Sequence, residues 1–185
     1  HATSGPVASD GPVRAAPRTG PPTTETRADP DPVTVHSGQN HTPTYQRTSE
    51  TVFDGTPRLD QVRQGKLADC YLVAAIGALA KQRPDAIENM IVDHNDGTCT
   101  VTLCTVSNWV VQPGTPGART SQIRVTKDMP SVNGTSPTYA SGAGGALWPS
   151  LIEKAYAIHM KSSKYQGLNT GGNAGEAMAV LTGAK

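Results

Sequence analysis

The sequence predicts an α+β fold in which a few helices pack beside a small antiparallel sheet. Residues 70–79 (CYLVAAIGAL) are apolar and free of proline, which is typical of a buried helix. Residues 148–160 carry apolar side chains at helical spacing, whereas residues 98–106 (TCTVTLCTV) alternate as a half-buried strand does. Helix and strand patterns thus occupy separate stretches of the chain, as they do in α+β proteins.

The composition limits the size of the domain and the class of its partners. At 185 residues the chain is long enough for one medium domain and a tail. A net charge of +1 gives no electrostatic basis for binding nucleic acid or an anionic membrane, and no stretch approaches about 18 uncharged apolar residues. The N-terminus lacks the basic and apolar regions of a signal peptide, and His1 in place of methionine is typical of a processed or excised end. A soluble protein is expected, either cytoplasmic or secreted within a larger one.

Residues 1–47 form a tail rich in proline and threonine, with almost no large apolar side chain. Such a segment cannot bury enough surface to offset its chain entropy, so we predict a disordered or extended linker. The alternative is that part of the tail lies across the domain as the strap of a propeptide does. The folded domain is expected to span residues 48–185, with Val52 and Phe53 as buried anchors near its start.

The helix predicted at 70–79 begins with a cysteine. Asp69 stands at the N-cap position, which places Cys70 in the first helical turn. The positive end of a helix favours the thiolate, which is the nucleophilic form. Gln64 lies on the approach loop, where its side-chain amide could join the Cys70 backbone N–H in stabilising an oxyanion. The competing interpretation is a small buried core cysteine, which is the usual state of this residue in an apolar helix.

The residues after this helix predict the sheet and its connections. A short helix is expected over residues 86–91, followed by a turn at 94–97. The strand at 98–106 is expected to pair with a second strand over 121–125, after a loop. Serine and glycine dominate residues 131–146, which indicates a mobile loop.

The last third of the chain predicts helices. The helix at 148–160 is expected to carry His159 half-buried on its apolar stripe, while Glu153 and Lys154 project elsewhere. A turn at 168–172 and a short helix over 174–181 follow.

The other two cysteines, Cys99 and Cys104, lie five residues apart on one predicted strand, so their side chains face opposite ways. A disulfide between them is implausible on that geometry. No cysteine or histidine cluster has the spacing of a zinc site, so no metal or other cofactor is expected. An odd number of cysteines fits a reducing compartment or a free catalytic thiol without establishing either.

Four segments, in order, resemble the calpain family of papain-like cysteine proteases. Residues 64–80 (QGKLADCYLVAAIGALA) resemble its nucleophile motif Q-G-x-L-G-D-C-W-[FL]-L-A-A-[IL]-x-x-L-A, with Ala68 in place of glycine and Tyr71 in place of tryptophan. Residues 124–130 (RVTKDMP) resemble the V-D-D-x-L-P strand end of the family, and residues 147–156 (LWPSLIEKAY) resemble its W-x-x-L-[LI]-E-K-A-Y helix.

The fourth segment, residues 165–183 (YQGLNTGGNAGEAMAVLTG), resembles Y-x-x-L-x-G-G-x-x-x-E-x-x-x-x-x-T-G, with one extra residue before its glycine pair. The resemblance implies a papain-like fold, of which this chain would be the helical N-terminal subdomain with a small sheet. It also implies an endopeptidase that acts on proteins or peptides, with Cys70 as the nucleophile and Gln64 as the oxyanion donor.

In the calpain family a histidine and an asparagine complete the site from a second, β-rich subdomain, within G-H-A-Y and N-P-W segments. Neither string occurs in this sequence. The two residues are expected on a second chain or a downstream segment, the core being cut short at Lys185. Two alternatives stay open: a catalytically incomplete relative used for binding, or a protease-type effector or toxin domain of a larger secreted protein.

Calpains also bind calcium near the nucleophile motif and near the W-x-x-L helix. The corresponding positions here are Gln61, with Asp60 beside it, and Ala146, which has no side-chain oxygen. Calcium prefers a cage of hard oxygen ligands, so tight calcium binding is not expected.

Overall fold

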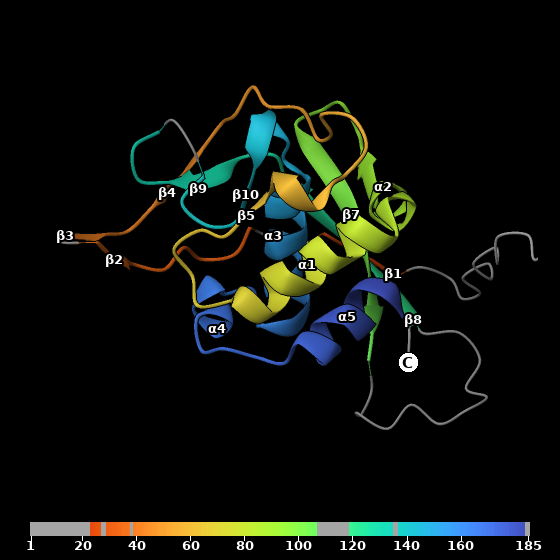
Figure 1. Ribbon diagram of the computed structural model, residues 1–185. Coiled ribbons are helices and arrows are strands. Elements are labelled where there is room, and N and C mark those ends of the chain that lie inside the picture. The colour runs from red at the N-terminus through yellow and green to blue at the C-terminus, as the bar shows by residue number, and fades with distance from the viewer. Residues whose placement is uncertain (1–22, 27–28, 38, 107–118, 135–136, 184–185) are drawn as a thin grey trace, which may run out of the picture.

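The computed structural model describes residues 23–26, 29–37, 39–106, 119–134 and 137–183 (Figure 1). Its α-helices are α1 Cys70–Gln82, α2 Pro84–Met90, α3 Trp148–Met160, α4 Tyr165–Leu168 and α5 Ala174–Thr182. Its strands are β1 Thr23–Thr26, β2 Val35–Ser37, β3 Gln39–His41, β4 Thr44–Gln46, β5 Val62–Arg63, β6 Ile91–Asp93, β7 Thr98–Thr105, β8 Arg119–Thr126, β9 Met129–Ser131 and β10 Ser141–Gly142. Two single-turn 3₁₀ helices are η1 Leu59–Gln61 and η2 Ala143–Gly145. This mixture of helices and small sheets is the α+β class that the sequence predicts.

The largest sheet has four strands in the order β1-β8-β7-β6. β7 and β8 are antiparallel along their whole length, and β6 pairs antiparallel with the other edge of β7. The predicted strand pair is therefore confirmed, and Cys99, Val101 and Leu103 share a fully buried face of β7. The strand is not half-buried as its pattern predicts, because Thr100 and Cys104 on the opposite face are buried too. The sequence pattern did not predict β6, because Ile91 reads as the end of a helix, nor β1, which joins β8 in parallel from the polar tail.

α3 lies at the centre of the domain and contacts β7, β8, β10, α1 and α4 (Figure 1). α1 packs against α2, α3 and α5, while α5 also contacts β7. α3 has the range that the sequence predicts, whereas α1 begins at the predicted residue and runs three residues beyond the predicted end; each has 13 residues. No helix in the described part of the chain is long and apolar enough to cross a bilayer.

Local chemistry sets the helix ends. At the start of α5, the Asn173 side chain accepts hydrogen bonds from the backbone N–H groups of Gly175 and Glu176. Gly183 ends that helix in the left-handed conformation, with φ of 67°. α2 starts with Pro84 in its first turn, where a missing N–H costs nothing.

α3 corrects one expectation about Glu153 and Lys154. The sequence predicts that these side chains project away from the core, but they are only 1% and 0% exposed. The reason is that all of residues 148–158 are buried, because strands lie against one side of α3 and helices against the others. A helix enclosed on every side has no solvent face to which a charged residue can turn.

Two further expectations differ from the structure near the start and middle of the domain. Val52 is buried, but Phe53 is only partly buried against the core. The segment 131–146, expected to be a mobile loop, contains Tyr139 and Ala140 at 1% exposure and the short strand β10. Because glycine and serine dominate this segment, its sequence pattern does not indicate that Tyr139 and Ala140 are buried. Residues 135–136 of this segment and most of the loop before β8 lie outside the described residues.

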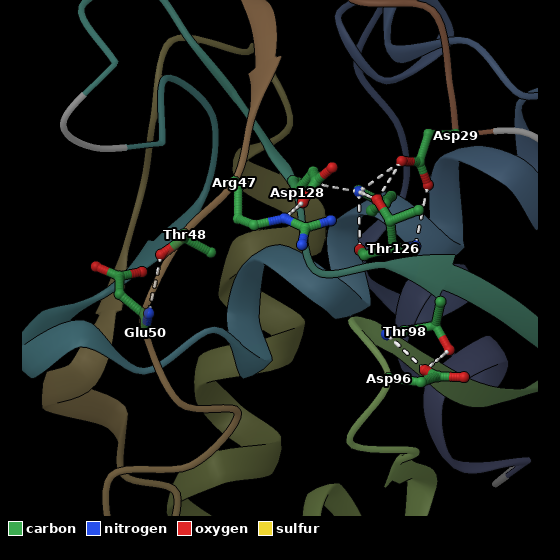
Figure 2. A network of polar contacts seen from close by, with 9 residues as sticks. Asp29, Arg47, Thr48, Glu50, Asp96, Thr98, Thr126 and Asp128 are labelled. Carbon is green, nitrogen blue, oxygen red and sulfur yellow. Dashed lines mark hydrogen bonds and ion pairs between the residues drawn. The ribbon is translucent and has the colours of Figure 1, made fainter.

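Several residues of the described part of the tail lie against the domain. The Tyr139 hydroxyl bonds both the N–H and the carbonyl of Val33, at 2.7 and 2.8 Å. The Tyr45 hydroxyl donates to the Pro30 carbonyl at 2.7 Å, and Asp29 bonds Thr126 at the end of β8 (Figure 2). Composition alone misses these contacts because hydrogen bonds from a few residues make them, rather than a run of apolar side chains. Residues 1–22, for which disorder is also predicted, lie outside the described residues.

Candidate active site

Cys70 is the first residue of α1, and its side chain is exposed. The carbonyl of Asp69 accepts the N–H groups of Leu72 and Val73, so the helix begins directly at the cysteine. The Cys70 N–H comes before the hydrogen bonds of the helix and has no carbonyl within it to bond. Cys99 and Cys104, in contrast, are buried. The alternative of a buried core cysteine therefore does not hold for Cys70.

Gln64 lies on the loop before α1, and its side chain folds back over that loop. Its Nε2 donates to the Leu67 carbonyl at 3.0 Å and to Asp69 Oδ1 at 3.4 Å. The second contact is long for an N–H···O hydrogen bond. It is the contact that a stronger acceptor, such as an oxyanion, could most easily replace.

The loop over residues 64–69 is held from two sides. β5, just before it, pairs with β10, and Lys66 donates its N–H to the Thr138 carbonyl at 3.0 Å. Gly65 lies so close to this segment that a Cβ added there would be 2.2 Å from the Tyr139 carbonyl. On the other side, Ala68 donates its N–H to Asn169 Oδ1 at 2.8 Å. The loop therefore has little freedom to move its two candidate groups apart.

The glycine pair after Asn169 also lies beside the start of α1. A Cβ added to Gly172 would be 2.5 Å from the ring of Tyr71, the residue that follows Cys70. The backbone of this segment thus passes directly over the start of α1, where no side chain separates it from the aromatic ring. The sequence pattern predicts only a turn here, because contact between distant segments has no local signature.

Asp69 differs from the simple cap that its position predicts. Its side chain makes no cap hydrogen bond and is fully buried. It points inward, toward Gln64 and the carboxyl of Glu153 from α3. Burial raises the pKa of Asp69, and burial together with the neighbouring Asp69 raises the pKa of Glu153 well above its usual range. The only sequence signal for this pair is that Glu153 matches the glutamate of the E-K-A-Y segment. That match predicts no role for Glu153.

Two of the histidines make structural contacts. His159, half-buried as predicted, lies with Nε2 3.2 Å from the Cys104 carbonyl, to which an N–H on that nitrogen donates. His94 Nε2 lies 2.8 Å from Thr100 Oγ1 in the turn between β6 and β7. Neither contact involves Cys70 or Gln64.

Gln61 occupies a position where calpains have an acidic residue, and in this chain its side chain forms structural hydrogen bonds. The Gln61 side chain is buried, accepts N–H groups from Arg58 and Trp148, and donates to the Asp54 carbonyl. Ala146 is buried as well. Among the described residues, no group of three or more His, Cys, Asp or Glu side chains has the arrangement of a metal site.

Cys70 and Gln64 are both exposed. A polar pocket of about 210 Å³ is lined by residues 46–50 of the tail junction and by Met129, Ser131, Gly134 and Pro137. Neither Cys70 nor Gln64 lines that pocket.

Comparison with known proteins agrees with these features. A family model described as "Calpain family cysteine protease" matches residues 37–185. The calpain-type cysteine protease DEK1 of Zea mays is 31% identical over 137 residues, which are 71% of this chain and 6% of that protein. The calpain-1 catalytic subunit of Sus scrofa is 29% identical over 139 residues, 71% of this chain and 17% of that protein. The chain thus spans a small part of the length of these relatives.

Proposed function

The chain belongs to the calpain family of cysteine proteases, and from that premise we propose that it is the nucleophile-bearing half of a calpain-type endopeptidase. Cys70 is the proposed nucleophile, and Gln64 with the Cys70 N–H is the proposed oxyanion site. The observation that carries this proposal is the exposed thiol at the first residue of α1, with the Gln64 amide folded over the same loop. The substrate class is proteins or peptides.

The chemistry assigned to these residues is acyl transfer. The Cys70 thiolate attacks the carbonyl carbon of a peptide, and a C–S bond forms as the carbonyl oxygen becomes an oxyanion. The Gln64 N–H turns from Asp69 to that oxygen, and the Cys70 N–H is the second donor. The tetrahedral adduct then expels the amine, which takes a proton from a histidine, and water hydrolyses the thioester with the same histidine as base.

That histidine and the residue that orients it are expected on a second subdomain. The exposed face of α1 supports this expectation, because Cys70, Ala74 and Ala78 follow one another at helical spacing and are all exposed. Leu59, 49% exposed, lies over Gly77 beside that stripe. An exposed row of small apolar side chains that leads from the nucleophile is the surface against which a second wall of the cleft would pack.

The test is reconstitution of hydrolysis. The chain is mixed with a segment from the same protein that contains the G-H-A-Y and N-P-W strings, and cleavage of a casein or quenched peptide is followed. We expect turnover that Cys70→Ser abolishes and that Gln64→Ala lowers by roughly 10²–10³-fold. Lys81→Ala, at the exposed far end of α1, is the matched control and is expected to keep full turnover.

A catalytically incomplete binding module is the second candidate. The observation that favours it is that both N–H groups of the Gln64 amide already have acceptors within the chain. Its outcome is distinct: no hydrolysis in the mixture, and no labelling of Cys70 by an electrophilic peptide. That pair of results would overturn the protease proposal.

A further inference from the structure

Two carboxyl groups are buried together directly beneath the proposed nucleophile. Asp69 is 0% exposed and Glu153 is 1% exposed. Within the described residues, the ion pairs all join other side chains, and neither of these carboxyls has a lysine, arginine or histidine within ion-pair distance. Two buried carboxylates without a cation repel each other strongly in a medium of low dielectric constant.

The hydrogen bonds of the pair indicate that it holds a proton. Both oxygens of Glu153 accept the Ala140 N–H, each at 3.1 Å, and Asp69 Oδ1 faces the Gln64 amide. Asp69 Oδ2 is buried and has no donor among the described residues. It lies beside Glu153, and a hydrogen bond between two carboxyls exists only when one of them is protonated. A single shared proton would satisfy the orphaned oxygen and remove the repulsion.

The pair also closes a ring of contacts around the approach loop. From Glu153 the contacts lead to Ala140, whose carbonyl accepts the Ser150 hydroxyl at 2.7 Å. Ala140 follows the Tyr139 backbone on which Gly65 rests. From Asp69 the contacts lead to the Gln64 side chain. The start of α1, the body of α3 and both candidate catalytic groups therefore depend on one pair of carboxyls.

We propose that Asp69 and Glu153 are positioning residues, which share one proton and thereby hold Gln64 and the Cys70 end of α1 in place. The role rests on the proposed protease function for its catalytic meaning. When the shared proton leaves, the two carboxylates push apart, the Ala140 and Gln64 contacts weaken, and the first turn of α1 loosens. The fold would then lose activity at alkaline pH through this pair, and not only through the groups that perform the chemistry.

The other titratable groups near the pair do not compete for this role in the range from pH 5 to 9. Burial raises the pKa of Tyr71 and of Tyr139 to about 12, and it raises the pKa of Tyr165 well above its usual range. These three hydroxyls stay neutral across that range. Glu176 on α5 acts electrostatically on Tyr71 and Tyr156. The adjacent Lys154 points the other way, to Asp29 and the end of β8.

The first test measures the urea midpoint of the full chain from pH 5 to pH 9. A carboxyl whose pKa is raised in the folded state binds more protons there than in the unfolded state, so stability falls as pH rises above about 4.5. We expect the wild-type midpoint to fall across this range and that of Glu153→Gln to stay nearly constant, because the glutamine N–H replaces the proton permanently. Glu88→Gln, the same change at an exposed position on α2, is the control and should follow the wild type. If Glu153→Gln also follows the wild type, the shared proton does not exist.

The second test reports on the nucleophile and needs no second subdomain. The rate at which iodoacetamide alkylates Cys70 is measured in the folded chain and in urea, and the ratio of the two rates is followed with pH. In the wild type we expect the ratio to drift by roughly threefold or more toward 1 between pH 7 and pH 9, as the first turn of α1 loosens. Glu153→Gln and Asp69→Asn should hold the ratio constant, each by supplying an amide N–H to the remaining carboxylate. A ratio that is independent of pH in the wild type, or equally dependent in both variants, would overturn the positioning role.

These outcomes separate this inference from the proposed function. If reconstituted hydrolysis fails while both pH tests succeed, the pair still positions the thiol, and only the protease proposal is lost. If hydrolysis succeeds and Glu153→Gln leaves the alkaline limb of its pH profile unmoved, the protease proposal stands and the pair has no positioning role.

Discussion

The ammonium of Lys154 lies 3.2 Å from Asp29 Oδ2, at a place where the lysine is fully buried and the aspartate belongs to the N-terminal segment. The same nitrogen donates to the carbonyls of Thr126, the last residue of β8, and of Asp128, and it lies 4.6 Å from the centre of the Tyr45 ring. A charge buried on the central helix is thus neutralised from a segment whose composition predicts disorder.

The first prediction is that Asp29→Asn destabilises the chain by about 3 kcal/mol, because it leaves the buried ammonium of Lys154 without its counter-charge. Asp60→Asn is the control: it breaks the Arg58–Asp60 pair, whose side chains are 55% and 75% exposed, and should cost less than about 0.5 kcal/mol. Urea unfolding at pH 7 measures both. Equal effects of the two variants would show that Asp29 does not anchor the tail.

The second prediction concerns the pH dependence of that same penalty. Burial lowers the pKa of Lys154 and Asp29 opposes this effect, so the folded lysine gives up its proton before the unfolded one does. A group whose pKa is lowered in the folded state adds stability at pH values above its unfolded pKa, which is about 10.4 for lysine. This stability is lost as pH falls through the folded pKa. Because no ion pair remains once the lysine is neutral, the Asp29→Asn penalty should shrink as pH rises from 7 toward about 10.5. A penalty that is constant with pH would contradict the ion pair.

The third prediction is that iodoacetamide modifies one thiol of the three under native conditions. Cys70 is exposed, whereas Cys104 is buried and burial raises the pKa of Cys99 to about 11, which keeps it protonated. We expect Cys70 to react roughly 100-fold faster than the other two, because reactivity follows thiolate content and access. Peptide mapping by mass spectrometry identifies the site, and Cys70→Ser is the control. Comparable labelling of Cys99 would mean that the β7 strand is not packed as described.

These contacts show which parts of the molecule the sequence could predict. Local signals were sufficient for α1, α3 and the β7–β8 pair, since helical and alternating patterns are written in neighbouring residues. The position of Cys70 at the start of its helix followed from the same pattern. Its exposure did not, because a cysteine in an apolar helix is usually buried, and only the structure shows that this thiol is exposed.

The features that could not be predicted all depend on distant partners. From the sequence, Glu153 and Lys154 are expected on the surface of α3. Both are buried, Glu153 beside Asp69 and Lys154 beside Asp29, and these two partners come from distant parts of the chain. The ordered contacts of Tyr139, within a glycine-rich stretch, likewise depend on Val33, which lies 106 residues away. Residue type and periodicity carry no information about such pairs.

The fourth prediction is that Gly65→Ala disturbs the approach loop more than an ordinary glycine substitution. The added methyl group would lie 2.2 Å from the Tyr139 carbonyl, a distance that requires the backbone to move. Gly134→Ala is the control, because Gly134 has φ of 73° but nothing within 4 Å of a new Cβ, so only a strain of about 1 kcal/mol applies. We expect Gly65→Ala to lower the free energy of unfolding by roughly 2 kcal/mol more than the control. Equal losses in urea unfolding would mean that the loop is not packed against this segment.

The fifth prediction is that the chain's own His159 is not the base of the proposed reaction. Its Nε2 is engaged with the Cys104 carbonyl on β7, so His159→Ala should cost about 1 kcal/mol of stability for the lost hydrogen bond. The rate of Cys70 alkylation and the turnover of the reconstituted protease should both stay within about twofold of wild type, since a base that acts in the step contributes roughly 10²–10⁴-fold. His94→Ala, which breaks a contact with Thr100 at the sheet edge, is the matched control. If His159→Ala alone lowers turnover by 100-fold or more, the base lies within this chain, and the expectation of a histidine on a second subdomain is wrong.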